Sequence, residues 1–147
     1  MNPNAVDVLL VEDNPNDAEL TIRELRKYNM TNNLVHVTDG QEALDFVFAT
    51  GQFSASRNIE YPPKIVLLDI QMPRLNGIEV LQQIRADGRT KKTPVVILTS
   101  SNQDPDIQRC YDLGANSYIV KPVDFKKFSE VIHTIGFYWL LLNQPPA

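Results

Sequence analysis

Three short, uninterrupted apolar runs constrain the fold of this chain more than any other feature. They are Val8–Val11, Ile65–Leu68 and Val95–Leu98, and each is made largely of branched residues. An apolar run of this length without alternation is typical of a strand that is buried on both of its faces. The sequence therefore predicts three inner strands of a parallel sheet.

Two weaker strand candidates and several helical segments complete the pattern. The weaker strands are Leu34–Thr38 and Ser117–Val120. Helix-start signals lie between the strands, as a capping residue followed by proline or by a glutamate three residues later. They stand at Asn14-Pro15, at Asp39 with Glu42, and at Asp104-Pro105, whose helix is expected to end at Gly114. Helical spacing also marks a third helix through Ile78, Leu81 and Ile84, and a fifth that begins at Asp124.

Strands that alternate with helices predict an α/β domain with a doubly wound, five-stranded parallel sheet and helices on both faces. The chain has 147 residues, close to the usual size of one domain, and no repeat or low-complexity linker divides it. We expect a single domain over 1–147, with its core at about 6–135 and an apolar C-terminal extension over 136–147. The site of such a sheet lies at the carboxyl ends of its strands.

Polar residues follow the predicted strands at those carboxyl ends. Glu12 and Asp13 follow the first strand and Asp69 follows the third. Thr99 ends the fourth, and Lys121 follows the fifth. A polar turn or a helix-capping loop would explain each residue singly. It would not explain why every acid ends a buried strand with no arginine nearby. We therefore expect three carboxylates, one hydroxyl and one ammonium around one cleft.

Such a cluster has specific chemistry. Three close carboxylates repel one another, so that one must hold a proton or a cation must bind between them. Hard oxygen ligands favour Mg²⁺ (or Mn²⁺), whereas Zn²⁺ is disfavoured because neither His36 nor His133 stands at a strand end. A carboxylate can attack phosphorus to form an acyl phosphate, and the cation and Lys121 would neutralise the phosphoryl oxygens. Thr99 could then donate a hydrogen bond to the transferred group.

Four segments also resemble the signature motifs of bacterial two-component receiver domains, in the same order and spacing. They read VLLVEDN, IVLLDIQMPRLNG, VVILTSS and SYIVKP. The resemblance covers roughly Val6 to Ile135, nearly the whole chain. It implies the flavodoxin-like (βα)₅ receiver fold with strand order 2-1-3-4-5. It also implies that the chain accepts a phosphoryl group from a histidine kinase and then signals to a partner.

The resemblance further implies a role for each residue of the pocket. Asp69 would accept the phosphoryl group. The metal would be held by Asp13, Asp69 and the backbone carbonyl of Gln71, with Glu12 acting mainly through water. Thr99 and Lys121 would sense the phosphoryl group.

A switch is implied as well. Tyr118 would turn inward when Thr99 moves, so that the face formed by the fourth helix, fifth strand and fifth helix repacks. The Lys121-Pro122 peptide is expected to be cis, a form that is accessible only before proline. The long connection Thr50–Lys64 and the short C-terminal extension are similar to those of cyanobacterial receivers that work with phytochrome-type histidine kinases. Another sensor kinase or a phosphorelay remains the alternative partner.

The last helix is apolar all round near its end, which reads FYWLLLNQPPA. One domain face cannot bury all of these side chains, and an exposed apolar patch of this kind usually marks an interface. We expect a homodimer through the last helix, although the tail could instead fold back over its own sheet. The candidate interface residues are Phe128, Ile132, Ile135, Trp139 and Leu142.

Composition excludes several other roles. A net charge of -4 and a pI near 5.1 argue against a nucleic-acid surface. A single cysteine, Cys110, favours the reducing cytoplasm and is expected to be a buried apolar residue. The N-terminus lacks the features of a signal peptide, and no apolar stretch is long enough to span a membrane. Only 27 residues follow Val120, so that no output domain is expected there.

Three rival functions share parts of the pattern. A phosphatase of the haloacid dehalogenase type needs a second carboxylate two residues after its aspartyl nucleophile, where this chain has Gln71. A flavin-binding carrier needs a phosphate-cradling loop after the first strand, where Glu12 and Asp13 would repel the phosphate. A receiver-like module that is never phosphorylated would not need the complete pocket. We therefore expect a signalling domain and not an enzyme, with slow self-hydrolysis whose rate Gln71 and Ser101 influence.

Overall fold

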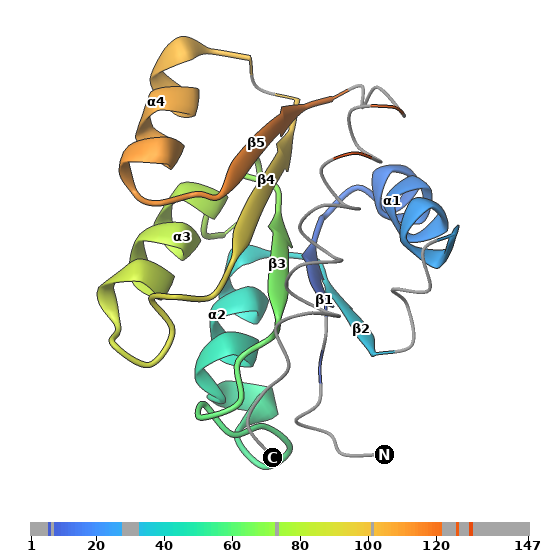
Figure 1. Cartoon of the computed structure of the whole chain (residues 1–147). Helices are drawn as coiled ribbons and strands as arrows, with labels where there is room; N and C mark the ends of the chain where they lie inside the picture. The colour runs from blue at the N-terminus through green and yellow to red at the C-terminus, as the bar shows by residue number, and fades with distance from the viewer. Residues whose placement is uncertain are drawn as a thin grey trace.

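The computed structural model describes residues 6, 8–27, 33–72, 74–100, 102–121, 126 and 130. Its centre is one parallel sheet of five strands in the order β2-β1-β3-β4-β5, as Figure 1 shows. The strands are β1 (Val8–Val11), β2 (Leu34–Val37), β3 (Ile65–Leu68), β4 (Val95–Thr99) and β5 (Ser117–Val120). The expected flavodoxin-like fold and its strand order are therefore confirmed.

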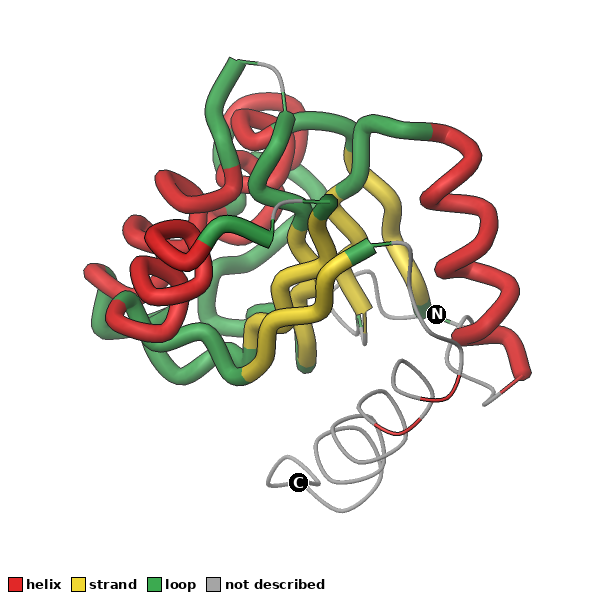
Figure 2. The backbone as a smooth tube through the Cα atoms, turned by 90° about the horizontal axis from the view of Figure 1, so that it is seen from above, coloured by secondary structure: helices red, strands yellow, loops and turns green. Residues whose placement is uncertain are grey.

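The three apolar runs form the inner strands, as predicted. Every residue of β1, β3 and β4 is buried, because helices cover both faces of the sheet. Alternate strand residues divide the core into two clusters. Leu9 and Val66 pack with residues of α2 (Gly40–Phe48) and α3 (Gly77–Ala86), whereas Leu10 and Leu67 pack with α1 (Pro15–Lys27). Figure 2 shows α1 on the opposite side of the sheet from α2 and α3.

The helices begin where local capping signals stand. The Asn14 side chain accepts hydrogen bonds from the N–H groups of Asn16 and Asp17 at 2.9 and 3.1 Å, which satisfies the open first turn of α1. Asp39 caps α2 by accepting from the Glu42 N–H at 2.8 Å. The reciprocal bond of the expected capping box is displaced by one residue, because the Glu42 carboxylate accepts from the Thr38 N–H at 3.4 Å.

Two helix ends depend on glycine or asparagine. The α3 helix is capped by Asn76, whose side chain accepts from the Glu79 N–H at 3.0 Å. The fourth helix, α4 (Asp104–Asp112), is followed by Gly114 with φ of +96°. That left-handed conformation favours glycine, so the expected end of α4 is confirmed.

The long connection between α2 and β3 is folded against α2. It contains a short 3₁₀ helix, η1 (Gly51–Phe53), and a buried Arg57. The Arg57 guanidinium lies 4.1 Å from the centre of the Phe46 ring and donates to the carbonyl oxygen of Tyr61 at 3.0 Å. One cation therefore ties the connection to the helix that precedes it.

Several expectations fall on residues that the structure does not describe. They are the cis peptide at Pro122, Ser101, and the dimer candidates Phe128, Ile132, Ile135, Trp139 and Leu142. Lys126 and Glu130, within the predicted fifth helix, are helical. The role of that helix as an interface stays a prediction. Within the described ranges, no helix combines the length and apolar character needed to cross a bilayer.

Candidate functional site

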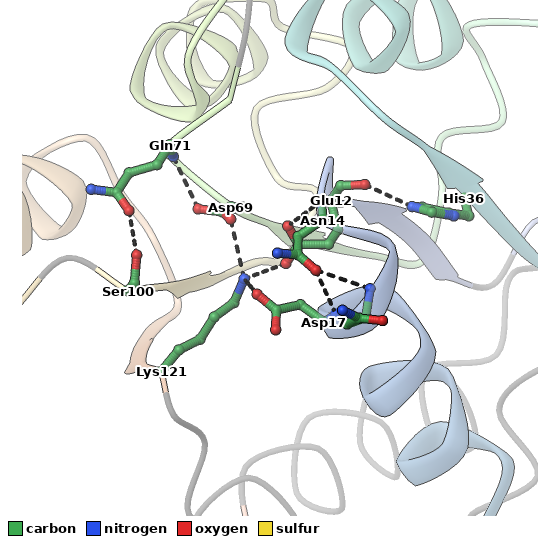
Figure 3. A network of polar contacts seen from close by, with 9 residues as sticks. Glu12, Asn14, Asp17, His36, Asp69, Gln71, Ser100 and Lys121 are labelled. Atoms are coloured by element: carbon green, nitrogen blue, oxygen red, sulfur yellow. Dashed lines mark hydrogen bonds and ion pairs between the residues drawn. The ribbon is translucent and has the colours of Figure 1, made fainter.

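Strand register brings the polar strand ends together. Val11 pairs with Leu68, so that Glu12 and Asp69 leave neighbouring strands at the same level. The Asp69 N–H donates to the Val11 carbonyl oxygen at 3.1 Å. Toward the β5 edge of the same sheet, the Lys121 N–H donates to the Thr99 carbonyl oxygen at 2.6 Å. Figure 3 shows the resulting cluster at the carboxyl edge.

Three carboxylates of this cluster are close enough to share one cation. Glu12, Asp13 and Asp69 each offer an oxygen, and these oxygens lie within 4.8 Å of one another. Glu12 and Asp69 are buried, whereas Asp13 is exposed to solvent. Oxygen donors with one open side fit a hard divalent cation that keeps some of its water. The donor set therefore fits the kind of metal that the sequence predicts.

The Lys121 ammonium contacts three carboxylates, two of which belong to this cluster. It donates to Glu12, to Asp69 at 3.1 Å and to Asp17 at 3.0 Å, and its side chain is only 12% exposed. Asp17 belongs to the first turn of α1, and its place in the pocket was not predicted from the sequence. A helix that starts just after a strand end carries its first turn to the same edge of the sheet. That placement was the one signal in the sequence that could have indicated Asp17.

Burial and charge oppose each other in this pocket. Burial raises the pKa of the Glu12 carboxyl to about 7, although the hydrogen bond and charge of Lys121 act to lower it. For Lys121, burial lowers the pKa, but hydrogen bonds to Glu12 and Asp17 and the charge of Asp69 outweigh it and raise the pKa overall. Lys121 therefore stays cationic, and the raised pKa lets the Glu12 carboxyl take a proton near neutral pH when no metal binds.

Asp69 is fixed through both of its carboxylate oxygens. Oδ1 accepts from the Gln71 N–H at 2.9 Å, and Oδ2 accepts from Lys121. The turn after Asp69 is held by Gly77, whose N–H donates to the Ile70 carbonyl oxygen at 3.1 Å. A Cβ at Gly77 would lie 2.3 Å from the Asp69 carbonyl oxygen, so only glycine fits. The role of Gly77 could not be predicted from the sequence, because the need for glycine there arises from this close approach.

Thr99 and Tyr118 occupy the neighbouring strands β4 and β5. Thr99 is fully buried and pairs with Val120, two residues beyond the half-buried Tyr118. Next to Thr99, the Ser100 hydroxyl donates to the side-chain carbonyl of Gln71, a contact between the ends of β4 and β3 that the sequence did not indicate. The structure thus places Thr99 and Tyr118 on adjacent strands, and their sensing and switching roles stay predictions.

His36 lies in β2, and its ring reaches a backbone atom and not the acidic side chains. Its Nε2 is 2.8 Å from the Glu12 carbonyl oxygen, a hydrogen bond that requires the proton on Nε2. A nitrogen that donates in this way is not available to a metal. The contact thus occupies Nε2 of His36, whereas His133 lies outside the described residues.

Comparison with known proteins gives a consistent result. The chain matches the family described as the response regulator receiver domain over residues 8–133. One relative, named "Probable methanogenesis regulatory protein FilR2", from Methanothrix harundinacea, is 37% identical over 140 residues, which are 95% of this chain and 87% of that protein. Response regulator Rcp1 of Synechocystis sp. is 32% identical over 146 residues, 99% of this chain and 96% of Rcp1.

Solved structures show the same likeness. The bacteriophytochrome response regulator RtBRR superposes with a TM-score of 0.80 at 42% identity, covering 97% of this chain and 84% of that one. The Mn²⁺-bound form of Rcp1 has a TM-score of 0.79 at 31% identity, covering 97% of this chain and 99% of that one.

Proposed function

This chain belongs to the response regulator receiver domain family, and from that premise we propose that Asp69 accepts a phosphoryl group from a histidine kinase. The observation that carries the proposal is the pocket itself. A buried Asp69 contacts Lys121 and shares a possible cation site with Glu12 and Asp13. A receiver-like module that is never phosphorylated would not need all four of these side chains at one sheet edge.

The proposed reaction transfers one phosphoryl group. An oxygen of Asp69 attacks the phosphorus of a phosphohistidine, and the phosphorus–nitrogen bond breaks as the oxygen–phosphorus bond forms. The electron pair of the broken bond stays on the imidazole nitrogen, which regains a proton from water. Later attack by water on phosphorus releases inorganic phosphate and restores the carboxylate.

The chain's own residues neutralise and orient the transferred group. The Lys121 ammonium lies 3.1 Å from Asp69 Oδ2 and would balance charge on the phosphoryl oxygens. Thr99 would donate a hydrogen bond to one of these oxygens. Glu12, Asp13, Asp69 and the Gln71 carbonyl would hold Mg²⁺, or Mn²⁺ as in the Rcp1 structure, which supplies further positive charge when bound.

We further propose that the chain signals and does not turn over external substrates. Gln71 stands two residues after Asp69, where a phosphatase of the haloacid dehalogenase type would have its general acid. Without that acid, water attacks the aspartyl phosphate slowly, and the adduct persists as a signal. Tyr118 and the α4–β5 face are the proposed route by which the signal reaches a partner.

The relatives support a more specific partner. RtBRR is named a bacteriophytochrome response regulator, and another solved relative, RcpA, is named a cyanobacterial phytochrome response regulator. Each is similar to 97% of this chain. A phytochrome-type histidine kinase in the cytoplasm is therefore the proposed donor. The acidic net charge of -4 disfavours direct binding to nucleic acid, and a homodimer through the last helix stays part of the proposal.

Intact mass spectrometry tests the central claim. Wild-type protein incubated with Mg²⁺ and acetyl phosphate should gain the mass of one phosphoryl group, and Asp69→Asn should gain none. Asp87→Asn is the matched control, because Asp87 is an aspartate paired with Arg89 outside the pocket and its loss should leave labelling unchanged. An unlabelled wild type, under conditions that label another receiver, would instead favour an interaction module that is never phosphorylated.

A further inference from the structure

We propose that Asp17 is a positioning residue that competes with the phosphoryl group for the Lys121 ammonium and so destabilises the phosphorylated state. The proposal rests on the proposed function of Asp69 and extends it to the first turn of α1. Asp17 takes no part in the chemical step. It acts through its contact with Lys121, at 3.0 Å between Oδ2 and Nζ.

The ammonium of a lysine has three donors, and the structure assigns all three. Lys121 donates to Glu12, to Asp17 and to Asp69, one carboxylate for each donor. Phosphorylation turns the Asp69 carboxylate into an acyl phosphate, so the ammonium must move from Asp69 Oδ2 toward the charge on the phosphoryl oxygens. Glu12 and Asp17 hold the other two donors and oppose that movement, so one of these two contacts weakens when Asp69 is phosphorylated.

Exposure indicates which contact gives way. The side chain of Glu12 is 3% exposed, whereas that of Asp17 is 37% exposed. A buried carboxylate that loses its cation is left uncompensated, which is costly, whereas water can replace the cation at an exposed carboxylate. The contact with Asp17 is therefore the one that the phosphoryl group displaces.

Asp17 also differs from the carboxylates that could bind metal. The cluster of oxygens within 4.8 Å of one another contains Glu12, Asp13 and Asp69 and does not include Asp17. Its backbone N–H is held by the Asn14 cap at 3.1 Å, so the carboxylate is presented from α1 toward the pocket in Figure 3. Asp17 thus adds a negative charge beside Lys121 without a place among the metal ligands.

Removing this charge should favour the phosphorylated state. A phosphoryl group brings about 1.5 to 2 negative charges into the pocket, and Asp17 opposes its binding by holding the Lys121 ammonium that these charges need. Asp17→Asn keeps the size of the side chain and removes the charge. A partly exposed ion pair of this kind corresponds to about a twofold to fivefold change in an equilibrium constant.

Beryllofluoride, which mimics a phosphoryl group on aspartate, provides the test. Its affinity is measured by ¹⁹F NMR at saturating Mg²⁺, and Asp17→Asn and Asp17→Ser should bind it about twofold to fivefold more tightly than wild type. Glu19→Gln is the matched control, because it removes one charge from the same helix but Glu19 pairs with Arg23 and not with Lys121. Equal affinity in Asp17→Asn and wild type, or an equal shift in Glu19→Gln, would overturn the proposal.

A double-mutant cycle separates action through Lys121 from a general effect on stability. In a Lys121→Gln background, Asp17→Asn should no longer change beryllofluoride affinity. A shift that persists without Lys121 contradicts the proposal. Failure of wild type itself to bind beryllofluoride or to become labelled at Asp69 would contradict the proposed function, so the two failures are distinguishable.

Discussion

Glu12 links the charge of the pocket to the stability of the fold. Burial raises its pKa from an ordinary value of 4.5 to about 7, so the metal-free native state binds a proton at Glu12 more tightly than the unfolded chain does. The resulting stabilisation is full below pH 4.5 and is lost as the pH rises toward and through 7.

We therefore expect wild-type protein in EDTA to lose stability between pH 5 and pH 8 relative to Glu12→Gln. The relative loss should be at most about 3 kcal/mol in the free energy of unfolding, measured by urea denaturation at several pH values. Mg²⁺ should reverse the loss at pH 8 in wild type, because a cation in the proposed site would bind the native state and stabilise its ionised carboxylates. Parallel curves for the two proteins in EDTA would show that Glu12 does not titrate in this range.

Single residues also show what a sequence can and cannot indicate. Glu12, Asp13, Asp69 and Lys121 could be placed at one edge because each directly follows an apolar run that marks a strand. Asp17 could not, because its contact with Lys121 joins residues 104 positions apart and depends on how α1 is rotated against the sheet. No local pattern encodes that rotation.

The start of α3 lies against the end of β3, and Gly77 makes that approach possible. A Cβ at position 77 would meet the Asp69 carbonyl oxygen at 2.3 Å and Ile70 Cα at 2.7 Å, both of which are backbone atoms that cannot move aside cheaply. Gly77→Ala should therefore cost about 1–3 kcal/mol in the free energy of unfolding and slow the labelling of Asp69 by acetyl phosphate. Urea denaturation and intact mass measure the two effects.

Gly88 supplies the control for this substitution. A Cβ at Gly88 would meet nothing within 4 Å, so Gly88→Ala should change neither stability nor labelling appreciably. Equal stability of Gly77→Ala and Gly88→Ala would contradict the close approach of α3 to β3.

Arg85 joins α3 to two loops at the amino-terminal edge of the sheet. Its guanidinium donates to the carbonyl oxygens of Thr93 at 2.6 Å and of Lys91 at 3.0 Å, and to that of Gly114 at 2.8 Å. A lysine cannot reproduce this planar set of donors. Arg85→Lys should therefore cost about 1–3 kcal/mol in the free energy of unfolding, measured by urea denaturation.

Arg89→Lys is the comparison for Arg85→Lys. Arg89 pairs with Asp87 at the surface, so its replacement should change stability by less than about 0.5 kcal/mol. Similar losses in the two variants would show that the loop carbonyls do not depend on Arg85.

The ends of the elements were less predictable than the elements themselves. The run at Val95–Leu98 extends by one residue in β4, because Thr99 pairs with Val120 of the neighbouring strand. The expected strand at Leu34–Thr38 ends at Val37, where Thr38 turns its N–H toward the Glu42 carboxylate. Both differences arise from partners elsewhere in the fold, which an apolar run cannot show.

The two faces of the sheet are covered by different helices, and the acidic pocket includes a residue from one of these helices. Helices α2, α3 and α4 pack together over one face, and Cys110 of α4 is buried there with the pKa of its thiol raised to about 11 by burial. The expectation of a buried apolar cysteine is therefore confirmed. Helix α1 covers the other face and contributes Asp17 to the pocket, so the proposed phosphorylation site borders the α1 side of the sheet.

The contacts of Lys121 also determine when the pocket can exist during folding. Its partners Glu12, Asp17 and Asp69 precede it by 109, 104 and 52 residues, so the ammonium arrives only when β5 has joined the sheet. Such long-range contacts form late because they close long loops. A growing chain that has not yet added β5 holds the acidic residues without their cation. The complete pocket therefore marks a chain whose sheet is assembled through β5, and a kinase that needs Lys121 in place would act only on such chains.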